Sequence, residues 1–202
     1  MKLYIIRHGE TPWNKVRKLQ GRTDIPLADT GIVLAKETGK NLQKVPFDLV
    51  FTSPLTRARQ TAECVLGERE IPIITDERIQ EISFGDWEGE CILNSTVLPT
   101  DFMEQFVENP RTFKRPPHGE NLIDVSERTH DFYEFLIHTP EYQDKTILIS
   151  THGAAGRCLL NHFYEDDDIW RGGVPKNCAV SIIEVQDGKS AVLEKDKIFY
   201  EE

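Results

Sequence analysis

Short runs of almost wholly apolar residues recur along the chain, and several are followed by longer segments with a helical pattern. Apolar runs of about four to eight residues without alternation are typical of strands that are buried on both faces of a sheet. Two further strand candidates close the chain, at residues 179–185 and 191–200, and the turn Asp187-Gly188 joins them. The four apolar runs are residues 2–7, 48–52, 71–75 and 146–150.

Four segments between the strands place apolar residues at the three- and four-residue spacing of a helix. The first includes Ile32 and Leu42, and Asp29 or Thr30 is its candidate N-cap. In the second, Ser53 is a candidate N-cap, followed by a proline that suits the first helical position. The last three helices are expected over about residues 55–66, 121–139 and 154–164.

Strands that alternate with helices predict an α/β protein with three α/β/α layers, in which helices cover both faces of a mostly parallel central sheet. Residues 92–120 interrupt this alternation, because prolines bracket only one short helical stretch there. The segment is too short to hold a core of its own. We therefore expect a single domain over residues 1–202, with residues 92–120 as an inserted lid.

The residues that follow three of the predicted strands carry the most reactive chemistry of the chain. In mostly parallel sheets, ligands bind beyond the carboxyl ends of the strands. Those ends carry Arg7-His8-Gly9, the segment from Ser53 to Arg57, and Thr151-His152-Gly153. We therefore expect two histidines and two arginines to meet in one crevice.

Such a crevice suits an anion, and phosphate above all. Arginine offers paired donors to phosphate oxygens, and a helix N-terminus adds N–H groups at the positive end of its dipole. One imidazole can act as a nucleophile while the other neutralises charge on a phosphoryl group. A general acid for the leaving oxygen is also needed, and the residues alone leave it open among Glu81, Asp86, Glu88 and Glu90.

Composition and charge exclude some classes of binding partner. The 202 residues include 24 Lys+Arg and 34 Asp+Glu, a net charge of −10, and so acidic a chain is a poor ligand for nucleic acid. No apolar run approaches the roughly 20 residues that span a membrane, and the N-terminus shows no signal peptide. Four cysteines without CxxC spacing suit reduced thiols. We expect a cytoplasmic protein that binds neither nucleic acid nor a membrane.

Four ordered segments resemble the signature of the histidine phosphatase (phosphoglycerate mutase-like) superfamily. The first runs from Leu3 to Thr11 and continues into Trp13-Asn14, and the last covers residues 150–153. Between them lie residues 51–62, FTSPLTRARQTA, and residues 81–89, EISFGDWEG. The segments keep the order and approximate spacing of the family, and the resemblance spans residues 3–153.

By this resemblance, His8 is the nucleophile that accepts the phosphoryl group, and Arg7, Arg57 and His152 bind that group. Glu81 becomes the acid that protonates the leaving alcohol and then the base that activates water. No metal and no other cofactor are expected, because the arginines supply the electrostatic stabilisation. The full set expected to bind substrate or phosphate, which includes positions that touch either in relatives, is Arg7, His8, Asn14, Gln20, Gly21, Arg57, Glu81, His152 and Gly153.

The superfamily includes phosphatases and mutases, so membership alone does not decide which of the two reactions this chain catalyses. Residues 53–57 and 84–89 look like the phosphatase branch, and mutases are typically longer at the C-terminus. We expect a metal-independent phosphomonoester hydrolase that acts through a phosphohistidine on a small phosphorylated metabolite and releases inorganic phosphate. A cofactor-dependent phosphoglycerate mutase and a non-catalytic, phosphate-binding regulatory protein are the alternatives. The sequence identifies neither the substrate nor the oligomeric state.

Overall fold

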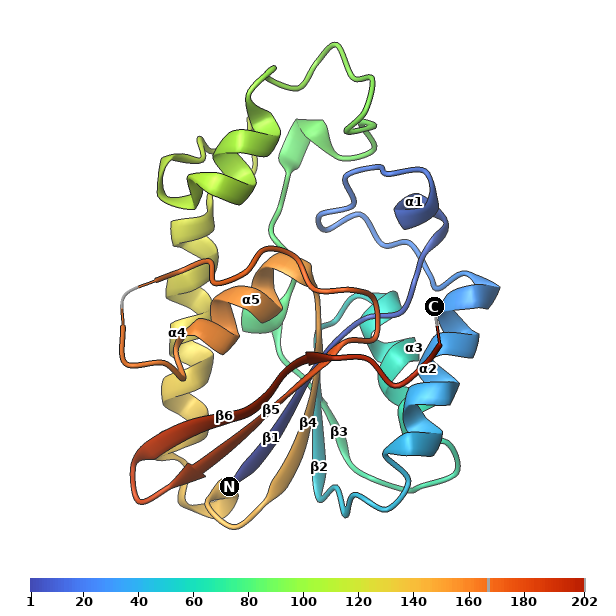
Figure 1. Cartoon of the computed structure of the whole chain (residues 1–202), viewed down its shortest axis with the longest axis vertical. Coiled ribbons are helices and arrows are strands. Elements are labelled where there is room, and N and C mark those ends of the chain that lie inside the picture. Colours follow the sequence, from blue (N-terminus) through green and yellow to red (C-terminus); the bar gives the residue numbers. More distant parts are fainter. Residues whose placement is uncertain (167, 202) are drawn as a thin grey trace.

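A computed structural model describes residues 1–166 and 168–201, and within them six strands form one central sheet (Figure 1). The strands are β1 (Lys2–Arg7), β2 (Leu49–Thr52), β3 (Ile73–Thr75), β4 (Thr146–Thr151), β5 (Val180–Gln186) and β6 (Lys189–Lys197). Their order is β3-β2-β4-β1-β5-β6, with parallel pairing from β3 to β1 and antiparallel pairing of β5 and β6. The predicted α/β fold with a mostly parallel sheet is confirmed.

Helices cover both faces of this sheet (Figure 1). The four longer ones are α2 (Asp29–Asn41), α3 (Thr56–Leu66), α4 (Leu122–His138) and α5 (Gly153–Asn161). Side chains of a strand point alternately to the two faces, so a strand that is apolar throughout can bury both. Along β1, Leu3 and Ile5 join the core under α4 and α5, whereas Tyr4 and Ile6 join the core under α2 and α3.

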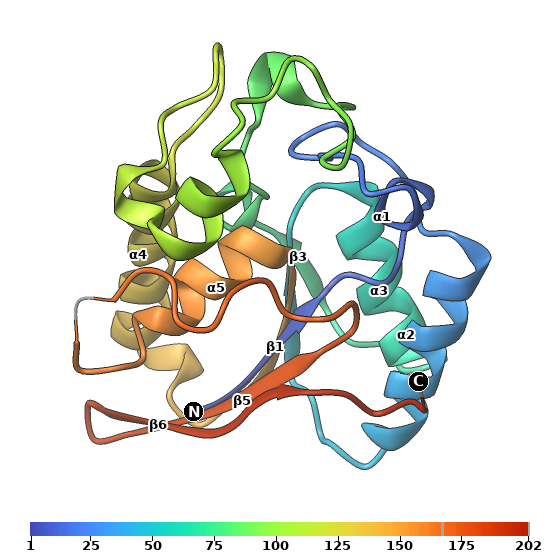
Figure 2. The same cartoon turned by 45° about the horizontal axis from the view of Figure 1, so that its top comes forward.

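The parallel strands bring their carboxyl ends to one edge of the sheet. In the register of the sheet, Arg7 of β1 lies beside Thr151 of β4, and Thr52 of β2 lies beside Ser150. The residues that follow these strands are therefore neighbours although they are far apart in sequence. The short helix α1 (Pro12–Lys15) lies at the same end of the molecule (Figure 2).

Residues 92–120 also lie beyond this edge of the sheet (Figure 2). They contain one π-helical turn, Glu104–Glu108, where the sequence predicts a short helical stretch. The ring centroid of Phe106 is 5.1 Å from that of Trp170 and 5.6 Å from that of Phe84, and both of these residues lie outside the segment. The segment thus shares its apolar core with the rest of the chain.

The start of α3 differs from the sequence prediction. The helix begins at Thr56 with Leu55 as its N-cap, two residues later than a cap at Ser53 requires. The Ser53 hydroxyl lies instead 2.7 Å from Nε2 of His152, on the neighbouring strand end. The Ser53 hydroxyl also accepts from the backbone N–H of Leu55 at 3.3 Å, so it combines a local contact with one between distant segments, although it does not cap α3.

Two further boundaries also differ. The apolar pattern does not predict α1, which forms because Thr11 and Asn14 cap each other's backbone N–H groups. The last strand covers Lys189–Lys197 rather than residues 191–200. Beyond it, the Tyr200 hydroxyl donates to a backbone carbonyl at 2.6 Å and its ring packs against the core under α2, so the chain leaves the sheet.

Candidate active site

His8 follows β1 directly and is only 3% exposed. Its Nδ1 lies 2.7 Å from the carbonyl oxygen of Gly9. Because a carbonyl oxygen only accepts hydrogen bonds, Nδ1 carries the proton and Nε2 keeps its lone pair. Burial first, and then the charges of Arg57 and Arg7, lower the pKa of His8 well below its usual 6.5. The ring is therefore neutral near neutral pH and has a nucleophilic nitrogen.

His152 directly precedes α5 and is fully buried. The centroids of its ring and the His8 ring are 5.2 Å apart, with the two planes tilted by 60°. Burial is the main cause that lowers the pKa of His152 well below 6.5, followed by the charge of Arg57. Two neutral imidazoles therefore lie side by side at the carboxyl edge of the sheet.

Arg7 and Arg57 bring two guanidinium groups to the same place. The Nε atoms of both are buried and have no hydrogen-bond partner in the part of the chain that the structure describes. Arg57 donates to the carbonyl oxygens of Gly21, at 2.6 Å, and Thr23, at 2.9 Å, and Arg7 donates to that of Pro175. Burial lowers the pKa of both guanidinium groups. Buried guanidinium donors that still lack an acceptor are suited to binding an anion such as phosphate.

The Glu81 carboxylate is held at the N-terminus of α5. It accepts hydrogen bonds from the backbone N–H groups of Gly153, at 2.9 Å, and of Ala154 and Ala155, each at 3.1 Å. The positive end of the helix dipole stabilises a negative group at this position. A protonated carboxyl group still accepts such bonds through its remaining lone pairs, so these contacts are compatible with proton donation.

The other three candidate acids are engaged elsewhere. Of the four, Glu81 alone lines the pocket that contains His8, as far as the described residues extend. Their partners are the His118 ring for Asp86, the backbone N–H groups of residues 22 and 23 for Glu88, and the Ser95 hydroxyl for Glu90. The structure therefore distinguishes between acids that the residue pattern leaves equivalent.

These groups surround a pocket of about 150 Å³. Every residue predicted to bind substrate or phosphate lines it except His152, whose ring lies against the His8 ring. Apolar side chains complete the lining, among them Ile92 and Phe106 from the inserted segment, and Val174. The lining thus combines cationic and imidazole groups with apolar walls, as a phosphoryl group attached to a small organic group requires.

Helix α1 and the loop that follows it present three predicted residues to this pocket. The side-chain oxygens of Asn14 and Gln20 accept hydrogen bonds from Thr11, at 3.0 Å and 2.9 Å. The NH₂ groups are therefore the donors that these amides offer to a ligand. Gly21 has a φ of 55°, and a Cβ there would lie 2.1 Å from Oε1 of Glu88, so the position requires glycine.

Three supporting groups escaped the sequence analysis. Ser53, assigned there as a helix cap, is the partner of His152. The Asn177 side chain donates to the carbonyl oxygen of His8 at 3.0 Å, and the Thr61 hydroxyl accepts from the backbone N–H that follows His8 at 2.9 Å. No pattern in the sequence signals these roles, because each joins segments that are distant along the chain.

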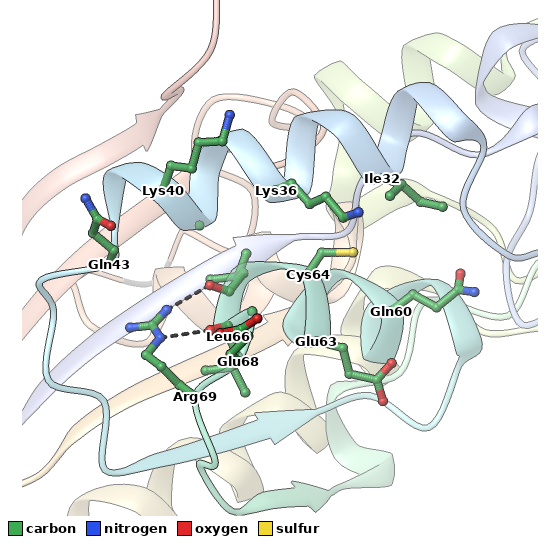
Figure 3. Close-up of a pocket in the computed structure, with 13 residues that line it drawn as sticks. Ile32, Lys36, Lys40, Gln43, Gln60, Glu63, Cys64, Leu66, Glu68 and Arg69 are labelled. Carbon is green, nitrogen blue, oxygen red and sulfur yellow. Dashed lines mark hydrogen bonds between the residues drawn. The ribbon is translucent and has the colours of Figure 1, made fainter.

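A larger hollow of about 880 Å³ lies between α2 and α3 (Figure 3). Lys36 and Lys40 of α2 line it, and the Cys64 side chain of α3 lies toward Lys36. The Arg69 guanidinium donates to backbone carbonyl oxygens at the end of α3, two of these contacts being the dashed lines in Figure 3. None of the predicted site residues lines this hollow, so the smaller pocket is the candidate active site.

The buried neutral imidazoles predict a loss of stability in acid. In the unfolded chain, His8, His152 and His162 have a pKa near 6.5, whereas burial lowers the pKa of all three in the folded state, that of His162 to about 4. Below about pH 6.5 the unfolded chain therefore binds more protons than the folded chain. The free energy of unfolding is expected to fall as the pH is lowered from about 7 to about 5. Its slope against pH corresponds to up to about three protons taken up on unfolding.

Urea unfolding at a series of pH values measures this slope. His8→Asn replaces the imidazole by a side chain that takes up no proton, so it is expected to lower the slope by about one proton. An unchanged slope in this variant contradicts the prediction, because it means that His8 gains no proton on unfolding.

The family model described as "Histidine phosphatase superfamily (branch 1)" matches residues 3–196. The chain belongs to the histidine phosphatase superfamily. The match extends the resemblance of residues 3–153 to the last two strands, and it confirms the family inferred from the four sequence segments.

Relatives within this superfamily are named as phosphatases and as mutases. The chain is 34% identical over 165 residues to the 2,3-bisphosphoglycerate-dependent phosphoglycerate mutase 2 of Gloeobacter violaceus, which covers 78% of this chain and 73% of that protein. It is 32% identical over 185 residues to the uncharacterized phosphatase PhoE of Bacillus subtilis, which covers 92% of this chain and 89% of that protein. Membership in the superfamily therefore supports a phosphatase or mutase enzyme.

Solved structures resemble the fold over nearly its whole length. YhfR of Bacillus stearothermophilus superimposes with a TM-score of 0.88 at 34% identity, covering 98% of this chain and 97% of that one. A variant of phosphoserine phosphatase from Entamoeba histolytica, in complex with phosphoserine, gives a TM-score of 0.79 at 28% identity, covering 96% of each chain. That relative binds a small phosphorylated molecule.

Within 1–166 and 168–201, none of the helices combines the length and the apolar character that crossing a bilayer demands. Over the same ranges, histidine, cysteine, aspartate and glutamate side chains form no group of three or more that could hold a metal ion.

Proposed function

We propose that this member of the histidine phosphatase superfamily hydrolyses small phosphomonoesters through a phosphohistidine at His8, without a metal ion. The observation that carries the proposal is the state of His8. Its Nδ1 is bound to the Gly9 carbonyl oxygen at 2.7 Å, which leaves the Nε2 lone pair free beside two guanidinium groups whose Nε atoms are buried and have no partner among the described residues. A neutral nucleophile next to unpaired cationic donors suits attack on phosphorus.

In the first step, Nε2 of His8 attacks phosphorus in line with the leaving oxygen. The N–P bond forms as the P–O bond to the alcohol breaks, and Glu81 donates its proton to the departing oxygen. Arg7, Arg57 and His152 stabilise the charge on the phosphoryl oxygens. Positioning and charge neutralisation supply most of the rate enhancement.

In the second step, water attacks the phosphohistidine. The ionised Glu81 takes a proton from the water, the new P–O bond forms, and the N–P bond breaks to release inorganic phosphate. His8 returns to its neutral form, and Glu81 is protonated again. Each proton that leaves the carboxyl group in the first step is thus restored in the second.

The pocket supports a small leaving group. Its volume is about 150 Å³. Pockets that enclose drug-sized ligands are larger, at about 300–1,000 Å³. Residues 92–120 contribute Ile92 and Phe106 to the lining, and we assign this segment the part of a lid on a single domain that covers the chain. Phosphoserine, bound by the Entamoeba relative, is of suitable size and is the first compound to test.

The test is a panel of phosphomonoesters assayed for released phosphate in the presence of a chelator, with His8→Ala as the blank. We expect phosphate release that the chelator does not lower. Loss of activity on chelation contradicts the metal-independent mechanism. Exchange of phosphate between phosphoglycerates without net release favours the mutase that the Gloeobacter relative suggests. Phosphate binding without any turnover favours a regulatory protein.

A further inference from the structure

A small cavity lies against His152, the histidine whose Nε2 contacts Ser53. Its volume of about 10 Å³ is close to the minimum that holds one water molecule. The lining combines apolar residues with polar groups of α5, β5 and β6. The polar residues that line it are Arg7, His152, Arg157, Ser181 and Asp196.

Arg157, one turn into α5, is the most fully engaged of these groups. Its side chain is 1% exposed, Nε donates to the Gly173 carbonyl oxygen at 2.7 Å, and Nη2 pairs with Asp196 at 2.8 Å. Its Nη1 is buried and finds no partner among the residues that the structure describes. A buried charged donor without an acceptor is costly, so an acceptor is expected in the cavity that it lines.

His152 presents a matching unpaired atom. Its Nε2 lies 2.7 Å from the Ser53 hydroxyl, and its Nδ1 is buried and likewise lacks a partner within the described ranges. A neutral imidazole has one N–H donor and one acceptor nitrogen. Which nitrogen carries the proton decides whether Nε2 can donate to a phosphoryl oxygen.

We propose that Arg157 is a positioning residue for His152 and acts through one water molecule bound in this cavity. The water accepts from Nη1–H of Arg157 and donates to Nδ1 of His152. Nε2 then carries the proton and donates it to the Ser53 hydroxyl, 2.7 Å away. The second hydrogen of the water faces the Asp196 carboxylate and the Ser181 hydroxyl, which complete the polar lining.

Electrostatics favours this tautomer over the alternative. If Nδ1 carried the proton, an N–H dipole would point toward the cavity that the Arg157 guanidinium lines, positive end toward positive charge. With the proton on Nε2, the Nδ1 lone pair faces that charge, and the bridging water is polarised to donate strongly. The proposed function benefits, because Nε2 of His152 is then a neutral N–H donor that can turn from the Ser53 hydroxyl to a phosphoryl oxygen when substrate binds; to that extent this inference rests on it.

Long-range ¹H–¹⁵N NMR of the full chain labelled at histidine tests the tautomer directly, with His152→Asn used to assign the signal. We expect the Nε2–H tautomer in the unaltered protein and a mixture with Nδ1–H in Arg157→Met. A wild-type His152 in the Nδ1–H form overturns the proposal, whether or not Arg157→Met folds. This measurement needs no turnover, so it is independent of the proposed function.

Kinetics with an accepted phosphomonoester give the second measurement. Arg157→Met is expected to lower kcat about tenfold with little change in KM, the size of effect seen when a group that orients a ligating imidazole is lost. Arg157→Lys restores a cationic donor and is expected to recover part of kcat and the Nε2–H tautomer. Equal losses in both folded variants, with the His152 tautomer unchanged, assign Arg157 a purely structural role and overturn the proposal.

Discussion

Replacing His8 with alanine is expected to lower kcat by about 10⁴- to 10⁶-fold, as loss of a nucleophile does in other covalent enzymes. The imidazole is 3% exposed, and Nε2, the nitrogen that the Gly9 carbonyl oxygen leaves free, is the atom that we propose forms the covalent bond. Without it, water must attack the bound phosphomonoester directly, in a pocket that offers no base in the position of Nε2. The phosphoenzyme is expected to disappear with the activity.

Steady-state rates measure the loss of kcat. Intact-mass spectrometry of samples quenched without acid measures the loss of the phosphoenzyme. The unaltered protein should gain the mass of one phosphoryl group during turnover, and His8→Ala should gain none. His138→Ala is the matched control, because that ring is exposed at the end of α4 and should leave both results unchanged. A His8→Ala protein that keeps a tenth of the rate removes His8 from the role of nucleophile.

The strands of the sheet could be predicted because the apolar pattern that marks each one lies within a few consecutive residues. β1 is apolar on both faces, so its strand conformation and its burial follow from six residues. The same topology brings Arg7, His8 and His152 together, because each directly follows or ends a parallel strand. Their convergence needs no knowledge of side-chain contacts, and the structure brings them to one edge as expected.

Other features depend on contacts that no local pattern carries. The helix predicted to begin after Ser53 begins only at Thr56, and the Ser53 hydroxyl contacts both the nearby Leu55 N–H and His152, 99 residues away. The residue pattern alone leaves Glu81 and Glu88 equivalent, and the structure gives them different contacts: Glu81 accepts from N–H groups of α5, whereas Glu88 accepts from those of residues 22 and 23. In the sequence, Arg157 is a polar residue on a mostly apolar helix and has no evident partner. The fold brings Asp196 of β6 to it.

Glu81→Gln is expected to slow the two chemical steps to different extents, depending on the leaving group. An alkoxide needs a proton as it departs, so with an alkyl phosphate the variant should form phosphoenzyme about 10²- to 10⁴-fold more slowly. The phenolate of p-nitrophenyl phosphate departs without one, so this first step should slow by no more than about tenfold. Hydrolysis of the phosphoenzyme should be slow in either case, because glutamine cannot activate water.

Rapid-mixing kinetics reveal the difference. With p-nitrophenyl phosphate, Glu81→Gln should release about one equivalent of p-nitrophenol per active site in a burst and then turn over slowly, while phosphoenzyme accumulates. An alkyl phosphate should give no burst. Glu88→Gln is the isosteric control: its carboxylate holds the loop at residues 22 and 23, so any loss should be the same for both leaving groups. If Glu81→Gln slows the first step equally for both substrates, the carboxyl group is not the proton donor, and its contacts with α5 are its whole contribution.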